Sequence, residues 1–365
     1  MTKKIRAIGA ACLLLLWAVL TGLAWFKPAQ DTSVSERRPL AQFPELSTQT
    51  VLEGKFMTTF EDYTLDQFPA RDTFRTLKSL VHYNVLQQKD NNGIYLVDGY
   101  AAKLDYPMNT EAVDHALGRL NYVYETYLKP QGSKVYMAVI PDKGYYLAQP
   151  NGYPAMDYSS LFTRVEKALP FASHIDITGS LSAKDYYFTD THWRQEMLLP
   201  TAEVLCKAMG VTAPTNCTAT KVNVPFYGVY YGQAALPMQP ETIYIMENPL
   251  LQSCTVYDYE TGKNTPVYNL EKATGKDPYE LYLSGPKSLL RIENPNAATD
   301  RELIIFRDSF GSSIAPLLVQ DYKTVTLVDI RYMDSRMLSR FLDFKGQDVL
   351  FLYSTLVLNS GTTLK

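Results

Sequence analysis

The chain has 365 residues, of which 46% are hydrophobic, and its formal net charge is −3. This length is enough for one large domain or two modest ones with a buried core. The balanced charge argues against a general nucleic-acid-binding protein, which needs an excess of basic residues to neutralise phosphates. A neutral or acidic polymer stays open as a substrate. The 27 tyrosines suit sugar binding, and they suit strands and core equally well.

An uncharged run from Ile8 to Phe26 follows three basic residues near the N-terminus, Lys3, Lys4 and Arg6. As a helix this run would be roughly 28 Å long, close to the hydrocarbon thickness of a bilayer. A cleaved signal peptide is the alternative. No small-x-small cleavage site follows the run, and Trp25 to Pro28 resembles a membrane interface instead. We therefore expect residues 1–27 to be an uncleaved signal anchor, which places the bulk of a single-pass protein outside the cytoplasm.

Residues 28–50 are rich in Pro, Ser, Thr and charge, and they predict a stalk that leaves the membrane. Residues 51–365 predict the main domain. Its first part, 51–90, contains two helical patterns that are interrupted at 66–72. Within the stalk, Glu36 to Arg38 is either a docking element or simply solvated. The turn at 91–93 leads into a strand at 94–97.

Strand and helix patterns then alternate along the chain. The predicted strands are 135–140, 174–177, 303–306, 324–328 and 349–352, and the predicted helices are 111–129, 158–169, 194–209, 312–320 and 333–342. Residues 220–300 break this rhythm with many Pro, Gly, Tyr and Thr, and they predict a mainly β insertion. The alternation indicates an α/β fold with a parallel sheet flanked by helices.

Three cysteines lie outside the predicted anchor. In an oxidising compartment Cys206 and Cys217 could close a small loop as a disulfide, which would leave Cys254 free. Alternatively, all three are small buried apolar residues. Their spacing is not that of a zinc site.

A serine stands in the segment Arg307 to Gly311, between a predicted buried strand and a predicted helix. Open α/β sheets bind their ligands just beyond the carboxyl ends of the strands. Backbone N–H groups at the start of a helix could stabilise an oxyanion next to Ser309. The plainer interpretation is that Ser309 is an ordinary helix cap.

Of the four histidines, only His192 has a carboxylate two residues before it, at Asp190. In an extended segment these two side chains would share one face. Asp190 could then hold one imidazole nitrogen, so that the other is free to take a proton from a serine. A loop histidine with local hydrogen bonds, next to Trp193 as a core anchor, is the alternative. Asp142-Lys143, after another strand, could line the site or cap a helix.

The segments Phe188 to Trp193 and Phe306 to Phe310 resemble the DHHW family, which is similar to the SGNH-hydrolase-like domains of the alginate O-acetylation proteins AlgJ and AlgX. Further matching segments occur in the same order along the outer chain: 36–40, 66–71, 141–143, 226–228, 283–285 and 328–332. The resemblance implies a circularly permuted SGNH arrangement, in which the Asp and the His precede the Ser.

Carried over by position, the resemblance implies Ser309 as nucleophile, His192 as general base and Asp190 as its orienting partner. The chain departs from the family's pattern in having Thr191 where the family's name has His, and Arg307 where the familiar motif has Gly, which puts the oxyanion geometry in doubt. Two further candidates belong to the same site. Gly285 could donate its N–H to the oxyanion, and Arg331 could bind substrate or form an ion pair with Asp329.

The expected function is extracytoplasmic, serine-dependent acyl transfer or ester hydrolysis on a cell-surface or exported polysaccharide. This chemistry requires no metal and no cofactor. The resemblance further implies a multi-pass membrane acyltransferase as partner and acyl donor. The alternative is a catalytically inactive, membrane-tethered carbohydrate-binding or assembly protein. A plain envelope scaffold would fit the anchor equally well, but it leaves the Asp-x-His and Asp-Ser pair unexplained.

Overall fold

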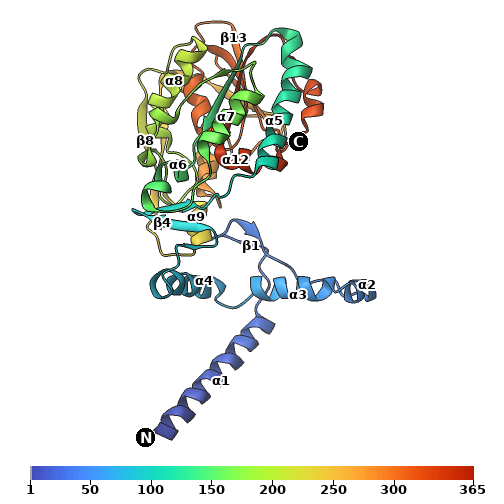
Figure 1. The fold of residues 1–365 in the computed structure, drawn as a ribbon, viewed down its shortest axis with the longest axis vertical. Helices are drawn as coiled ribbons and strands as arrows, with labels where there is room; N and C mark the ends of the chain where they lie inside the picture. Colours follow the sequence, from blue (N-terminus) through green and yellow to red (C-terminus); the bar gives the residue numbers. More distant parts are fainter. Residues whose placement is uncertain (1) are drawn as a thin grey trace. The chain divides into compact units, whose positions relative to one another are not determined.

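The computed structural model describes residues 2–365, which form two compact units (Figure 1). The first unit comprises Met1–Asn91 and Tyr231–Pro237. The second comprises Asn92–Tyr230 and Met238–Lys365, and it contains all the residues predicted for the active site.

The first unit begins with helix α1 (Thr2–Phe26). Its stretch Lys3–Phe26, 24 residues long, is apolar enough to cross a membrane, and none of it is buried by the rest of the protein. This is consistent with a single-pass anchor. A signal sequence has the same length and composition.

Residues 28–50, expected to be a stalk, are folded against the helices that follow. The guanidinium of Arg38 donates to both carboxylate oxygens of Asp66, at 2.6 and 2.8 Å, and Arg71 donates to Glu36 at 2.5 Å. Glu36 and Arg38 of this segment are therefore paired within the unit. The elements of this part are β1 (Thr32–Ser33), β2 (Arg38–Pro39), α2 (Thr48–Leu52), α3 (Lys55–Asp66), α4 (Arg71–Leu80) and the π-helical turn η1 (Val81–Val85). The predicted interruption thus lies between α3 and α4.

The second unit is built on an eight-stranded sheet with the order β11-β10-β12-β14-β13-β15-β6-β7. Five neighbouring strands are parallel: β14 (Tyr322–Val328), β13 (Arg301–Arg307), β15 (Asp348–Ser354), β6 (Val135–Ile140) and β7 (Ser173–His174). In the centre, Phe306 of β13 is paired with Val328 on one side and Phe351 on the other. The predicted α/β class is confirmed.

Helices cover both faces of this sheet (Figure 1). Helix α8 (Leu199–Met209) and the turn η10 (Ala315–Leu318) pack on one face, against a core that includes Ile305 and Leu352. Helices α5 (Thr110–Val123), α7 (Tyr158–Ala168) and α12 (Thr355–Asn359) pack on the other, against Phe306 and Phe351. Strands buried on both faces read as continuous apolar runs, which is why they were visible in the sequence.

The region 220–300 is only partly a separate insertion. Strands β8 (Thr218–Phe226) and β9 (Glu241–Glu247) form their own antiparallel ribbon. In contrast, β10 (Thr255–Asp258), β11 (Lys263–Thr265) and β12 (Leu289–Glu293) extend the central sheet by antiparallel pairing beyond β14. Their alternating pattern predicted strands correctly, but pattern alone does not say which sheet edge a strand joins.

Several helices are shorter than predicted. The segment 312–320 divides into α11 (Gly311–Ile314) and η10, where Pro316 lacks the N–H that a continuing helix needs. The segment 333–342 is the 3₁₀ turn η11 (Ser335–Arg340). Helix α8 begins at Leu199 rather than 194, with Pro200 in its first turn, and a 3₁₀ turn precedes it (Gln195–Met197).

Candidate active site

Ser309 lies two residues beyond the end of β13, at the carboxyl edge of the parallel sheet. The preceding Asp308 is fully buried. Its carboxylate accepts the N–H of Phe310 at 3.0 Å and the N–H of Ser354, at the end of neighbouring β15, at 2.8 Å. Asp308 therefore fixes the turn that presents Ser309, by tying it to the adjacent strand.

The segment with Asp190 and His192 is a tight bend between Tyr186 and Trp193, which form an isolated β-bridge. Asp190 Oδ1 accepts a hydrogen bond from the backbone N–H of His192, at 3.0 Å. The same oxygen lies 2.6 Å from the ring nitrogen Nδ1 of His192, also in a hydrogen bond. The bend differs from the extended segment expected from the sequence. An Asp that accepts the N–H two residues on favours such a turn, and here it also points the carboxylate at the imidazole.

The other ring nitrogen of His192, Nε2, lies 2.7 Å from Ser309 Oγ. Asp190 is fully buried and His192 is 8% exposed, whereas Ser309 is partly exposed. A proton on Nδ1 shared with Asp190 leaves Nε2 as an acceptor for the serine hydroxyl. The structure thus brings the three predicted residues into one hydrogen-bonded chain, in the arrangement of a Ser-His-Asp triad.

A loop from the β8–β9 region holds the far side of Asp190. The N–H of Val229 donates to Asp190 Oδ2 at 2.8 Å, and the N–H of Gly228 donates to Thr189 Oγ1 at 2.9 Å. A Cβ atom at Gly228 would lie 2.3 Å from backbone atoms of Thr189 and Asp190. Only glycine permits this approach. The segment 226–228 is one of those that carry the family resemblance, but its sequence does not predict the contact with the bend.

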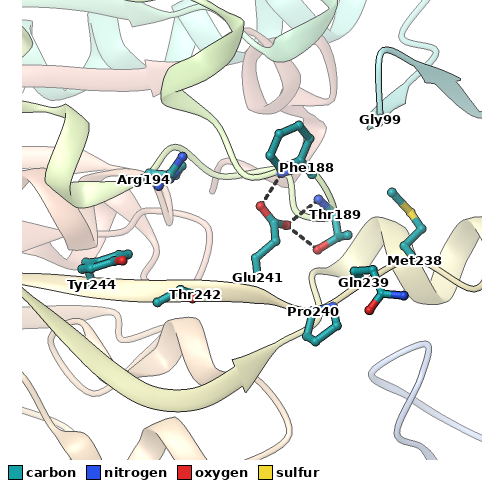
Figure 2. A pocket seen from close by; sticks show the side chains of 10 residues that line it. All are labelled: Gly99, Phe188, Thr189, Arg194, Met238, Gln239, Pro240, Glu241, Thr242 and Tyr244. Atoms are coloured by element: carbon teal, nitrogen blue, oxygen red, sulfur yellow. Dashed lines mark hydrogen bonds between the residues drawn. The ribbon is translucent and has the colours of Figure 1, made fainter.

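Glu241, the first residue of β9, is a second support that the sequence analysis missed. Its carboxylate accepts the N–H of Phe188 at 2.6 Å, and the N–H and hydroxyl of Thr189 at 2.7 and 2.6 Å (Figure 2). It therefore holds the backbone just before Asp190. These residues also line a cavity of about 440 Å³, together with Arg194 and Tyr244. No local pattern links Glu241 to a loop so distant in the sequence.

Aromatic side chains enclose the imidazole. The ring of Tyr279 stacks on His192 with a centroid distance of 4.0 Å, and its hydroxyl donates to Ser313 Oγ at 2.7 Å. Burial raises the pKa of Tyr279 well above its usual value, so it stays a neutral donor. Trp193 donates its indole N–H to Ser313 Oγ at 2.8 Å and to the carbonyl of Phe310 at 3.1 Å. The histidine bend and the serine turn are thereby joined as one packed body.

Arg307, which replaces the glycine of the familiar motif, is fully buried beneath the serine turn. Its Nη1 lies 3.7 Å from Asp329 Oδ2, and burial lowers its pKa below the usual value. A Cβ atom at Gly311 would lie 2.7 Å from the Cβ of Arg307, so Gly311 makes room for the arginine stem. Arg331 donates to both oxygens of Asp329, at 2.9 and 2.6 Å, as the ion-pair alternative expects.

The structure argues against Gly285 as an oxyanion donor. Its N–H donates to the carbonyl of Tyr282 at 3.2 Å and closes a turn in which Leu283, Ser284 and Gly285 all have positive φ. The N–H is therefore already in use. The backbone N–H of Ser309, by comparison, makes no backbone hydrogen bond with any of residues 2–365.

In the structure Cys206 and Cys217 are both free thiols and do not form the candidate disulfide. Cys206 is buried on the core side of α8, and burial raises its pKa to about 12. Cys217 lies partly exposed, with Asn248 Nδ2 3.5 Å from its sulfur. Cys254 is also buried. The alternative of small buried apolar residues therefore describes Cys206 and Cys254.

Asp142 caps helix α6 (Lys143–Leu147) by accepting the N–H of Gly144 at 2.8 Å, as the helix-cap alternative expects. Lys143 is buried, and its ammonium donates to the carbonyls of Tyr187, at 2.9 Å, and Phe188, at 3.3 Å. Burial lowers its pKa to about 7. Lys143 thus supports the start of the histidine bend. Within residues 2–365 there is no cluster of three or more side chains that could hold a metal ion.

No family model matches the sequence. No curated protein matches it either. Among solved structures, the chain is similar to a DHHW family protein from Eubacterium siraeum, with 21% identity and a TM-score of 0.61 over 75% of this chain and 94% of that one. It is also similar to Bacillus cereus PatB1 with a sulfonyl adduct, with 18% identity and a TM-score of 0.57 over 73% of this chain and 95% of that one. Over about three quarters of its length the chain therefore has the same α/β fold as the DHHW family structure.

Proposed function

We propose that this protein is a serine-dependent acyltransferase or esterase that acts on acetyl esters of an extracytoplasmic polysaccharide, with Ser309, His192 and Asp190 as its catalytic residues. The observation that carries the proposal is the chain of hydrogen bonds from Asp190 through His192 to Ser309, at 2.6 and 2.7 Å. An inactive carbohydrate-binding relative would have no use for this geometry. Acetyl as the group, and polysaccharide as the substrate, come from the resemblance to the DHHW family.

In the first half of the reaction, His192 Nε2 takes the proton of Ser309 as Oγ attacks the ester carbonyl. Asp190 stabilises the imidazolium that forms. The imidazolium then protonates the departing alcohol oxygen, which leaves acetyl-Ser309. In the second half, His192 takes a proton from an acceptor hydroxyl, which attacks the acetyl carbonyl and regenerates the serine. With a sugar acceptor the protein is a transferase, and with water it is an esterase.

The tetrahedral intermediate carries a negative oxygen that needs donors placed in advance. The N–H of Ser309 is our candidate for the first donor, because it is not used in the backbone hydrogen-bond network of the described chain. The N–H groups of Phe310 and Gly311 are already engaged with Asp308. The N–H of Gly285 already donates to the carbonyl of Tyr282, which argues against this role. A second donor to the oxyanion would therefore have to move into place when the substrate binds.

We further propose that α1 is an uncleaved single-pass anchor and that the catalytic unit lies outside the cytoplasm. The basic residues before α1 favour that orientation. If the protein is a transferase, a multi-pass membrane acyltransferase is the expected acyl donor, because acetyl-CoA is cytoplasmic. That partner follows from the family resemblance alone.

The fold neighbour with a sulfonyl adduct suggests a direct probe. We expect an aryl sulfonyl fluoride to modify the wild-type protein once, on Ser309, and to abolish its turnover of p-nitrophenyl acetate. Adding short oligosaccharides as acceptors to that assay then separates transferase from esterase, because only a transferase yields acetylated sugar. Full turnover by Ser309→Ala would refute the proposal. Absence of both the adduct and turnover in the wild type would favour the carbohydrate-binding alternative, with glycan binding as the next assay.

A further inference from the structure

The first unit exposes an unusual number of large apolar side chains. Twelve exposed large hydrophobic residues lie between residues 43 and 86. The much longer second unit has eight. Scattered apolar residues are normal on a surface, but a concentration of this kind marks a contact with something else.

The clearest part of this surface is a stripe on α4 and η1 formed by Phe74, Leu77, Val81 and Val85. Their spacing of three or four residues puts them along one side of the helix. They are 42%, 56%, 37% and 70% exposed, respectively. We refer to these four residues as the apolar stripe.

The opposite side of the same helix already has its partners within the unit. Arg71 is paired with Glu36, and Arg75 donates to the carbonyl of Gly232 at 2.8 Å. Ser79 is fully buried and donates to the carbonyl of Ala234. An amphipathic helix of a soluble protein normally turns its apolar side inward. Here Arg71, Arg75 and Ser79 on the polar side contact the protein, and the apolar stripe is left to contact something outside it.

The position of α4 in the chain indicates what that contact is. Gln67, in the junction between α3 and α4, is hydrogen-bonded twice to the backbone of Gln30, at 2.9 Å in each case. Gln30 comes four residues after Phe26, the end of α1, and four residues reach at most about 14 Å. If α1 spans a membrane, the junction is held at the membrane surface, and α4 begins only four residues later.

We infer that α4 and η1 lie in the membrane interface with the apolar stripe inserted among the lipids, so that the first unit is a membrane-seated platform rather than a free tether. The inference rests on the proposal that α1 remains as an anchor. Helices with one apolar side and one polar side bind at this depth of a bilayer. Arg71 and Arg75 both pair with Glu36 and are not part of the apolar stripe, so the inferred contact is made by apolar side chains. It should therefore form on zwitterionic lipid and survive high salt.

The test uses the full chain, reconstituted into vesicles of phosphatidylcholine alone, with Cys12 and Cys217 replaced by serine. An environment-sensitive fluorophore is attached to Leu77→Cys in the apolar stripe. The control is Asp72→Cys, at an exposed position on the other side of the same helix. A third label, on Leu16→Cys, reports whether α1 is inserted.

We expect the label at position 77 to shift to shorter wavelength, to be quenched by lipids that carry a quencher near the headgroup, and to lose most of its quenching by aqueous iodide. The label at position 72 should stay open to iodide. A label at 77 that iodide quenches as strongly as the one at 72, while the label at 16 lies in hydrocarbon, would overturn the inference and leave the anchor intact. It would point to a protein partner for the stripe. Labels at 16 and 77 both open to iodide would refute anchor and platform together. Acetyl ester turnover, measured on the same samples, tests the proposed chemistry separately.

Discussion

Replacing Gly228 by alanine should disable Ser309 although the two residues do not touch. The new Cβ would lie 2.3 Å from the N and Cα of Asp190 and from the carbonyl carbon of Thr189. Ordinary contacts begin near 3.4 Å, so the two backbones must separate by about 1.1 Å, the difference between these distances. Because the clashing atoms are backbone, no side-chain rotation can relieve them.

That displacement acts on the proposed catalytic residues through Asp190. It removes the support that the Val229 N–H gives to Oδ2, and it lengthens a hydrogen bond to His192 that is now 2.6 Å. A shift of about 1 Å in a positioning contact can reduce catalysis about 100-fold. We expect a loss of that size in the rate at which Ser309 is acetylated, together with about 1–3 kcal/mol of lost stability from overpacking.

The assay is the release of p-nitrophenolate on acetylation, followed by stopped flow, with thermal unfolding measured in parallel. The matched control is Gly118→Ala, in the middle of α5, where a Cβ meets nothing within 4 Å. This variant should keep full activity and gain up to about 1 kcal/mol in stability. If Gly228→Ala does not fold, Val229→Pro removes the N–H that Asp190 accepts, at the start of α9 (Val229–Ala234), and should slow acetylation about tenfold. Wild-type acetylation rates in both variants would refute the reasoning.

Three further changes test neighbouring contacts. Asp190→Asn should lower the acetylation rate by about 100- to 10,000-fold, because it no longer fixes the tautomer of the imidazole, and a wild-type rate would remove Asp190 from the triad. Glu241→Gln places an amide donor opposite the N–H and hydroxyl donors of Thr189, so the acetylation rate should fall about tenfold while thermal unfolding changes little. Glu241→Asp keeps the carboxylate and should retain more activity. Equal acetylation rates in the wild type and Glu241→Gln would contradict this role. Lys143 has a pKa of about 7 when folded and the usual higher value when unfolded, so between about pH 7 and 10 the unfolded state binds more protons and the free energy of unfolding should rise with pH. That slope, measured by urea denaturation, should vanish in Lys143→Met, and an unchanged slope would assign it to other groups.

Much of the fold could be predicted because buried parallel strands are visible as apolar runs. Strand β6 was predicted at its observed limits, and the cores of β13, β14 and β15 lay within theirs. What the sequence could not supply was the sheet edge that β10, β11 and β12 join, since alternation is the same in either sheet. Helix ends were also misplaced, at Pro316 and Pro200, where the missing N–H shortens or delays the helix.

Residues of the site could be predicted where their contacts are with neighbours in the sequence. They could not be predicted where their contacts are with residues far away in the sequence. The close pairing of Asp190 and His192 could be predicted because they lie two positions apart in the sequence, and Ser309 could be predicted from its place after a strand. Glu241 and Gly228 come from another ribbon and support the bend only through the tertiary fold. For Gly285, a resemblance in a turn does not show that its N–H is free, and in the structure this N–H donates to the carbonyl of Tyr282.

Residues 28–50 show the same limit of local sequence patterns. A segment rich in charge suggests solvation, yet Arg38 and Glu36 find partners in Asp66 and Arg71, which belong to the next helices. Ion pairs between segments leave no periodic signal in either one. These ion pairs join residues 28–50 to the first unit, and the hydrogen bonds between Gln30 and Gln67 hold the start of this segment beside the junction before α4.

The most direct test of the central claim is the intact mass of the wild-type protein after brief exposure to p-nitrophenyl acetate, alongside Ser309→Ala and His192→Ala. We predict a single acetyl adduct on the wild type, mapped by peptide analysis to Ser309, and none on either variant. An adduct of the same extent on Ser309→Ala, or one mapped to another residue, would contradict the proposed nucleophile. A wild-type protein that stays unmodified and turns over no ester would contradict the enzyme itself.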